Sequence, residues 1–373
     1  MSVTTPIRTI TPQWLRPGNY RGASYNFRTW AREGQYLKLS SLGEFGLIQR
    51  LSTVLGSGSP AQLVLGIGDD AAVWRGTPDC LTLATVDSLV EGVHFDLGTT
   101  SWEDLGWKAL AENLSDIAAM GGAPRYALVG LGLPAHRTAE EAEALYAGMR
   151  ECAAAFDCHI VGGDTVRSPV VWLHITVIGE SLPVRAGSPP ILTRSAAEPG
   201  DLIAVTGPLG ASAAGLRMLQ QNDRSSGSAR IIAAHLRPSP RVAAGQVLVE
   251  AGVRCAIDIS DGLLADVGHI CERSKVDAEI DSDLVPVDPD AARAFGSAAL
   301  DLALTGGEDY ELVCTGSRGA LDQANSRLQI LGEAPVTVIG AIVRQAGEHP
   351  EVRLREASGE LVVVASGGYQ HFG

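Results

Sequence analysis

Two long segments of the chain carry apolar residues at helical spacing. In residues 101–120, Ser101 precedes an apolar stripe as an N-cap residue, and a pair of glycines follows the stripe. In residues 138–156, Thr138 and Glu141 have the spacing of a capping box ahead of a second stripe. Both segments are therefore predicted to be amphipathic helices.

Shorter apolar runs have the length and alternation of strands. In residues 81–87, Thr85 and Asp87 share one face with two leucines, because strand side chains alternate. This strand therefore presents two oxygen-bearing side chains on the same side. The other elements predicted in this half are a helix at 42–54 and strands at 64–67, 159–161 and 170–178.

A proline-rich stretch at 182–192 interrupts the pattern. We place a domain boundary there, which gives an N-terminal domain at 41–185 and a C-terminal domain at 186–373. In the second domain strands lead through glycine or aspartate turns into helices, as at Gly262. The pattern predicts an α/β (α+β) fold with two domains.

The first 40 residues differ from the rest of the chain. They contain five arginines and no acidic residue before Glu33. We expect residues 1–40 to be a disordered basic extension, or to be translated from a start site upstream of the natural one. A transit peptide is disfavoured because the amphipathic pattern is weak.

Composition excludes several classes of protein. Hydrophobic residues make up 45% of the 373 residues, enough for a large core, yet no run of about 18 apolar residues predicts a membrane span. The net charge of −14 argues against a nucleic-acid partner. The six cysteines form no C-x-x-C pair, so zinc and redox motifs are not indicated, and a cytoplasmic location is expected.

Positive charge for binding phosphate is scarce. The lysines are Lys38, Lys108 and Lys275, and neither a P-loop nor the protein-kinase motifs occur. Bound metal ions and arginines would therefore have to supply much of the charge. We also expect the backbone N–H groups of the glycine turns at 207–210 and Gly262, which precede helices, to bind phosphate oxygens.

Acidic residues recur in one kind of position, after apolar residues at a strand end or on a helix flank. The adjacent Asp69 and Asp70 follow a glycine-rich turn, and two charges about 4 Å apart repel by roughly 4 kcal/mol at an effective dielectric of 20. Carboxylates with hydroxyls, and without clusters of His or Cys, suit Mg²⁺. The sequence therefore predicts a cradle for several Mg²⁺ ions and a polyphosphate. The further acidic positions are Asp87, Asp116, Asp164, Asp258 and Asp261.

A series of short motifs runs from about residue 42 to residue 372. They are "GIGDDAAV", "TVDSLVEGVHF", "KALAENLSDIAAMGGAP", "VGGDTVRS", "LTRSAAEPGDLIAVTGPLGASAAGL", "AIDISDGLLADVGHI", "LTGGEDYEL" and "GGYQHF". In these motifs the chain resembles the thiamine-monophosphate kinases. The resemblance implies ATP-dependent phosphorylation of thiamine monophosphate to thiamine diphosphate. It also implies the fold of aminoimidazole ribonucleotide synthetase, with a homodimer whose N-terminal sheets close into a barrel.

The resemblance assigns roles by position. Val86 stands where the family often has a hydroxyl residue, so only its backbone carbonyl could bind metal, and the basic extension has no expected counterpart. The implied Mg²⁺ ligands are Asp70, Thr85, Val86, Asp87, Asp116, Asp164, Asp258 and Asp261, of which Asp87, Asp116, Asp258 and Asp261 are the catalytic set. Those implied for ATP are Tyr146, Gly163, Asp164, Arg194 and Ser260, with Tyr146 the weaker candidate. Those implied for the thiamine part are His94, Glu308 and Tyr369.

Structural alternatives exist for several of these residues. His94 could be a packed loop histidine, Glu308 could form a solvated pair with Asp309, and Tyr369 could anchor the C-terminus. Lys108 is expected to cover its own helix rather than bind phosphate.

The rival functions are other enzymes of the fold and a non-catalytic nucleotide or metal sensor. Selenophosphate synthetase needs a reactive Cys or selenocysteine in a glycine-rich N-terminal loop, and none of the cysteines lies in one. The hydrogenase-maturation relative ends in cysteine, whereas this chain ends in glycine. A sensor would have lost carboxylates, and none is missing.

Overall fold

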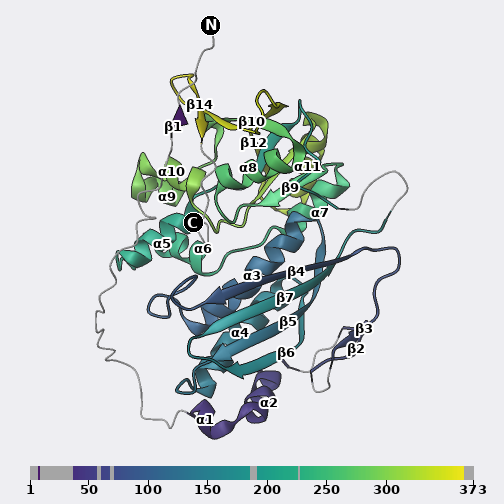
Figure 1. Ribbon diagram of the computed structural model, residues 1–373, viewed down its shortest axis with the longest axis vertical. Coiled ribbons are helices and arrows are strands. Elements are labelled where there is room, and N and C mark those ends of the chain that lie inside the picture. Colours follow the sequence, from purple (N-terminus) through teal and green to yellow (C-terminus); the bar gives the residue numbers. More distant parts are fainter. Residues whose placement is uncertain are drawn as a thin grey trace.

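The computed structural model describes residues 7–8, 37–56, 60–67, 71–184, 191–225 and 227–364. Two sheets organise this part of the chain, one in each half, and each carries helices (Figure 1). The fold is therefore mixed α/β with two domains, as predicted. No helix of the described residues is long and apolar enough to cross a membrane.

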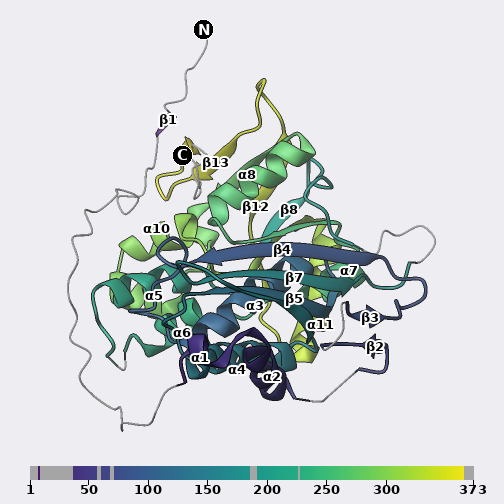
Figure 2. The ribbon, with the colours of Figure 1, turned by 60° about the horizontal axis from the view of Figure 1, so that its bottom comes forward.

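The N-terminal half is built on a four-stranded sheet in the order β4-β7-β5-β6. Strands β5 and β6 run parallel, and the other neighbours are antiparallel. Helices α3 and α4 lie together against one face of this sheet (Figure 2). The elements of this half are α1 (Leu39–Leu42), α2 (Glu44–Leu55), β2 (Leu63–Leu65), β3 (Val73–Trp74), β4 (Thr82–Val90), α3 (Trp102–Ala119), β5 (Ala123–Leu133), α4 (Ala139–Ala155), β6 (His159–Arg167) and β7 (Trp172–Glu180).

Only one face of this sheet is covered by the described residues. Leu173, Ile175 and Val177 of β7 belong to the hydrophobic core formed with α3 and α4. On β4 the alternate residues point the other way, and Val86 is 48% exposed there. The four strands therefore have one buried face and one open face.

The eight-stranded sheet of the C-terminal half has the order β1-β14-β13-β10-β12-β8-β11-β9. Alternate residues of its strands enter different cores: Ile203 packs with α8, whereas Ala204 packs with α7 and α11. Helices therefore cover both faces of this sheet. Its elements are β1 (Ile7–Arg8), β8 (Leu202–Thr206), α5 (Ala211–Gln220), α6 (Ala229–Leu236), α7 (Val242–Glu250), β9 (Cys255–Asp258), α8 (Leu263–Ser274), β10 (Val276–Asp281), the 3-10 turn η2 (Ser282–Leu284), α9 (Pro289–Phe295), α10 (Ala298–Thr305), β11 (Leu312–Gly316), α11 (Arg318–Leu331), β12 (Val336–Arg344), β13 (Val352–Arg355) and β14 (Leu361–Val364).

Helix α3 lies between the two halves. It contacts α4, β4 and β7 on one side and α7 and β9 on the other, and most of its residues are buried. The predicted N-cap is confirmed, since the N–H of Asp104 donates to the Ser101 hydroxyl at 3.1 Å. The capping box of Thr138 and Glu141 on α4 is confirmed as well.

Several predicted boundaries differ from the structure. The helix predicted at 42–54 is interrupted at Gly43, whose φ of 74° is a conformation that glycine adopts readily. The strand predicted to end at Val161 continues to Arg167, because β6 pairs with β5 along this whole stretch. Asp164 therefore lies within a strand, and the turn expected from the two glycines before it is wrong. Asp87 likewise lies inside β4, which continues to Val90.

Two short pieces of the expected extension contact the folded chain. Ile7 and Arg8 form β1, which pairs in parallel with β14. The N–H of Leu37 donates to the Glu140 carboxylate at 3.2 Å, and Lys38 forms a bridge with Thr138 at the start of α4.

Candidate active site

Helix α3 gives the strand β4 two hydrogen-bond partners. The Thr85 hydroxyl donates to the Asp116 carboxylate, and the backbone N–H of Asp87 donates to the Asn113 side chain at 3.1 Å. Because Asn113 and Asp116 are three positions apart, both face the same spot. The prediction that Thr85 and Asp87 share a strand face is confirmed.

The same helix reaches the C-terminal half through Ser115. Its hydroxyl donates to the Asp258 carboxylate at 2.7 Å, and both side chains are buried. Asp258 ends β9, a strand of the other sheet. Carboxylates from β4, α3 and β9 are thus gathered where the two halves meet.

These three carboxylates oppose one another's ionisation. Burial and the neighbouring Asp116 raise the pKa of Asp87 to about 6. Burial and Asp116 also raise the pKa of Asp258 to about 7, and burial raises the pKa of Asp116. Arg194 acts in the opposite direction on Asp116 and Asp258. We refer to Asp87, Asp116 and Asp258 as the carboxylate cluster.

The chemistry of the carboxylate cluster suits a hard cation. All its ligand atoms are oxygens, and the pKa of each carboxylate is raised chiefly because the group is buried. Mg²⁺ prefers oxygen ligands and often bridges carboxylates and phosphates through water. The residues present therefore fit the metal that the sequence predicts.

A second acidic group lies at the start of α8. Asp261, Asp266 and His269 each offer a ligand atom, and the three atoms lie within 4.8 Å of one another. One oxygen of Asp266 already accepts hydrogen bonds from the backbone N–H groups of Ser260, Asp261 and Gly262, each at 3.1 Å.

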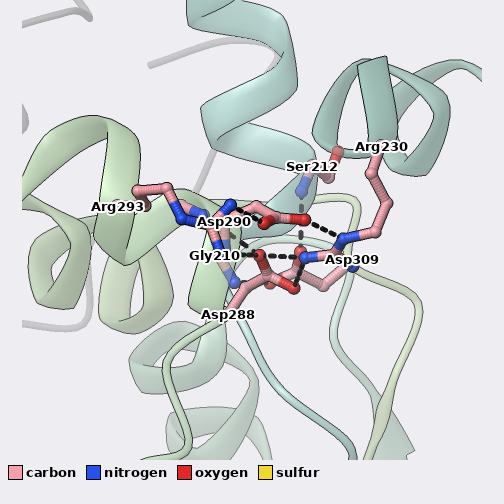
Figure 3. A network of polar contacts seen from close by, with 8 residues as sticks. Gly210, Ser212, Arg230, Asp288, Asp290, Arg293 and Asp309 are labelled. Atoms are coloured by element: carbon pink, nitrogen blue, oxygen red, sulfur yellow. Dashed lines mark hydrogen bonds and ion pairs between the residues drawn. The ribbon is translucent and has the colours of Figure 1, made fainter. Parts of the chain in front are cut away.

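The expectation that glycine turns offer free N–H groups to phosphate is wrong at both turns. At the start of α8 those groups bind Asp266, which is buried. At the start of α5 the N–H groups of Gly210 and Ser212 bind the Asp309 carboxylate at 2.6 and 3.0 Å (Figure 3). Each helix N-terminus thus has an aspartate of the chain itself as its hydrogen-bond acceptor.

The segment 306–310, which we call the GGEDY loop, is held in an unusual conformation. Glu308 and Tyr310 have φ angles of 65° and 50°, which non-glycine residues rarely adopt. Their N–H groups donate to the carbonyls of Ser260 and Ile259, at 2.9 and 3.0 Å. A Cβ atom on Gly307 would lie 2.4 Å from the Ser260 carbonyl oxygen, so glycine is needed for this approach.

Figure 3 shows the hydrogen bonds by which Asp309 holds the GGEDY loop to the start of α5. Its carboxylate caps α5, while Asp288 nearby caps α9 and binds Arg230, which also contacts Asp290. The loop is therefore anchored through its backbone to the segment that joins β9 to α8, and through the Asp309 side chain to the start of α5.

The side chain of Glu308 meets a buried lysine. Its Oε2 lies 2.9 Å from Nζ of Lys108 on α3 and 3.3 Å from Nδ1 of His235 on α6. Burial opposes ionisation of Glu308, but Lys108 and His235 lower its pKa overall. Two alternatives from the sequence are therefore wrong: Lys108 is buried and paired across elements, and Glu308 is not part of a solvated pair with Asp309.

His94 lies near Glu308. Its Nδ1 accepts a hydrogen bond from the Val90 N–H at 3.0 Å, and its charge would lower the pKa of Glu308. Two of the three residues expected to meet the thiamine part are thus brought together. The third, Tyr369, and the metal candidate Asp70 lie outside the described residues.

Three other candidates lie away from the carboxylate cluster. Asp164 and Val86 are on the open face of the sheet, whereas Asp87 is on the covered face. Asp164 lines a hollow of about 480 Å³ there with residues that include Ser88 and His174. Tyr146 is 6% exposed within the core under α4, where it offers no surface to a nucleotide.

Comparison with known proteins identifies the chain. The AIR synthase related protein N-terminal domain matches residues 68–181, and the C-terminal domain of the same name matches residues 198–353. The thiamine-monophosphate kinase of Escherichia coli (strain K12) is 41% identical over 341 residues, which are 88% of this chain and 98% of that protein. The chain belongs to the thiamine-monophosphate kinase family.

Solved structures of the family have the same fold. The thiamine-monophosphate kinase of Stenotrophomonas maltophilia K279a is 37% identical with a TM-score of 0.73, covering 83% of this chain and 96% of that one. The protein AaThiL, solved in complex with AMPPCP and TMP, is 31% identical with a TM-score of 0.68, covering 91% of this chain and all of the other. Like its relatives in the thiamine-monophosphate kinase family, this chain is an enzyme.

Two residues of this site, Glu112 and His235, were not predicted from the sequence, and Lys108 was expected only to cover its own helix. Lys108, Glu112 and the predicted metal ligand Asp116 are spaced four apart, so a single face of α3 carries three charged groups. All three lie on a helix most of whose residues are buried, and that contrast could have indicated a functional face. His235 gave no such signal, because it lies on α6 and approaches Glu308 only through the tertiary fold.

Proposed function

We propose that this protein transfers the γ-phosphoryl group of ATP to thiamine monophosphate and so forms thiamine diphosphate. Membership of the family supports this reaction, and the carboxylate cluster is the observation that carries it. The three carboxylates come from two domains, and burial together with the charge of Asp116 makes their ionisation unfavourable. Bound cations would offset this free-energy cost. Such an arrangement suits an enzyme that must bring two polyanions together.

The chemistry requires positioning more than proton transfer. The acceptor is a phosphate oxygen that is already anionic near neutral pH, so no strong general base is needed. When bound, Mg²⁺ would offset the repulsion between the two phosphate groups and the charge of the transition state. Asp87, Asp116 and Asp258 would hold it, Thr85 and Ser115 would orient the carboxylates, and Arg194 would add positive charge.

We assign substrate recognition to the part of α3 around Lys108, two turns before Asp116. Glu308 and His94 are the described candidates for the thiamine part, and Tyr369 remains a candidate from the sequence. Gly163, Ser260 and Asp164 remain candidates for ATP. Asp164 lies on the open face of the N-terminal sheet. It would therefore share a metal ion with the carboxylate cluster only in another conformation of the chain or in a complex with another subunit.

We further propose a homodimer formed through the open face of the N-terminal sheet. Val86 is 48% and Val166 is 40% exposed on that sheet, and the hollow beside Asp164 has mostly apolar walls. Pairing of two such faces would close the two sheets into a barrel and bury these valines.

The experiment is turnover of ATP by the full chain with Mg²⁺, tested with thiamine monophosphate, thiamine and formylglycinamidine ribonucleotide side by side. The proposal expects thiamine diphosphate and ADP in equal amounts from the first, and no ATP turnover with the other two. ATP turnover with formylglycinamidine ribonucleotide instead would indicate another enzyme of the fold, and nucleotide binding without turnover would indicate a sensor.

A further inference from the structure

The two side chains of the Lys108–Glu308 ion pair differ in their exposure to solvent. The Lys108 side chain is 4% exposed and the Glu308 side chain 31%, so the lysine is enclosed while the carboxylate opens outward. A buried ammonium without a partner is costly, and Glu308 is the acid to which Lys108 donates. Burial raises the pKa of Glu112, one turn further along α3, although Lys108 acts in the opposite direction.

The two oxygens of Glu308 are in different situations. Oε2 receives the Lys108 ammonium at 2.9 Å and lies 3.3 Å from His235. His235 in turn contacts the Ser212 hydroxyl at 3.1 Å, which orients its ring. Because the contacts with Lys108 and His235 are both made by Oε2, the contact with a ligand is assigned to Oε1.

The GGEDY loop keeps that atom in place. The backbone of Glu308 is bound to Ser260, and the neighbouring Asp309 caps α5, so the side chain starts from a fixed point. A strained φ at Glu308 persists because these contacts over-determine it. Such preorganisation improves recognition, because less conformational freedom is lost when the ligand binds.

We propose that Lys108 is a positioning residue that makes Glu308 a specific acceptor for the ring amino group of the substrate, an inference that rests on the proposed function. Lys108 compensates the negative charge and holds Oε2, so Glu308 acts mainly through a hydrogen bond that Oε1 accepts. The substrate class is then a phosphate ester that carries a heteroaromatic amine. The opposing interpretation is that Glu308 attracts the cationic thiazolium ring by charge.

The test compares thiamine monophosphate with the analogue in which the pyrimidine amino group is replaced by a carbonyl oxygen. Both substrates carry the thiazolium charge, but only the first has an N–H donor at the exocyclic position that is proposed to meet Oε1. For the wild type we expect kcat/KM to favour the amine by at least about a hundredfold, as for sites built around a hydrogen bond. Lys108→Met should reduce this preference by at least about tenfold, mainly by raising KM for thiamine monophosphate, with KM for ATP unchanged.

Two further variants keep the test decisive. Lys38→Met removes the same charge from an exposed side chain and should leave the preference unchanged. His235→Gln removes the imidazole that contacts Oε2 and should reduce the preference for the amine by a smaller factor than Lys108→Met does. If Lys108→Met does not fold, the result for His235→Gln tests the proposal. The proposal would be overturned if Lys108→Met and His235→Gln lowered kcat/KM equally for both substrates. It would also be overturned if the wild type accepted both substrates equally. A wild type with no thiamine monophosphate kinase activity would instead refute the proposed function.

Discussion

Replacing Asp258 by asparagine is expected to stabilise the protein when metal and nucleotide are absent. Burial and the neighbouring Asp116 raise the pKa of Asp258 from 3.8 to about 7. The side chain is 3% exposed, so solvent screens this effect little. Asparagine has nearly the same shape, and its carbonyl oxygen can still accept the hydrogen bond from Ser115. The substitution therefore removes the charge and keeps the packing.

The size and the sign follow from linkage. A pKa raised by about 3 units corresponds to a cost of about 4 kcal/mol once the group is ionised, which is an upper value because the structure relaxes. The folded protein binds this proton more tightly than the unfolded chain does. The cost is therefore absent below about pH 4, grows as the pH rises, and is complete above about pH 7.

Thermal unfolding in EDTA from pH 5 to pH 8 would test this reasoning. Asp258→Asn should unfold at a temperature several degrees higher than the wild type at pH 8, with a smaller difference at pH 5, and should lack kinase activity. Asp322→Asn changes an exposed acid on α11 and serves as the matched control. A variant that is no more stable than the wild type at pH 8, or a difference that does not change with pH, would refute the argument.

Four further outcomes are expected. Asp87→Asn and Asp116→Asn should each abolish kinase activity with unchanged circular dichroism, and turnover like that of the wild type would remove the residue from the metal site. Mg²⁺ with ADP should raise the unfolding temperature, because saturation at about 100 times the dissociation constant adds roughly 2.7 kcal/mol; a flat titration would count against the carboxylate cluster as a metal site. Removal of residues 1–36 should leave kcat and KM unchanged, and a folded but inactive product would show that the extension is functional. Gly307→Ala should raise KM for thiamine monophosphate, because the new Cβ would lie 2.4 Å from the Ser260 carbonyl oxygen and displace the GGEDY loop; kinetics like those of the wild type would show that the loop tolerates a side chain.

Local patterns predicted the long helices well. The caps at Ser101 and Thr138 depend on residues three positions away, so the sequence contains the whole interaction. The shared face of Thr85 and Asp87 follows from strand geometry in the same way. By contrast, the extension of β6 through Asp164 depends on pairing with β5, a tertiary contact that overrides the local turn signal of two glycines.

The residues of the candidate site also differ in whether local sequence patterns or only tertiary contacts reveal them. The carboxylate cluster was found because aspartates after apolar residues are unusual, and because the family motifs include them. The pairing of Lys108 with Glu308 joins positions 200 residues apart, and no local pattern reports it. The N–H groups at the start of α5 and α8 were expected to bind phosphate. Those of α5 are bound instead by Asp309, 99 positions away from Gly210, and those of α8 by Asp266 in its own first turn.

The position of α3 has a consequence for how the site forms and opens. Side chains of this one helix bind β4, β9 and the GGEDY loop, through Asn113, Ser115 and Lys108. Neither sheet can therefore assemble the active site alone, and partial unfolding of either half would release partners in the other. Amide hydrogens of α3 should exchange with solvent only in openings that approach the free energy of global unfolding. The catalytic residues would then be among the last parts of the chain to lose their order, although they lie at the junction of two domains.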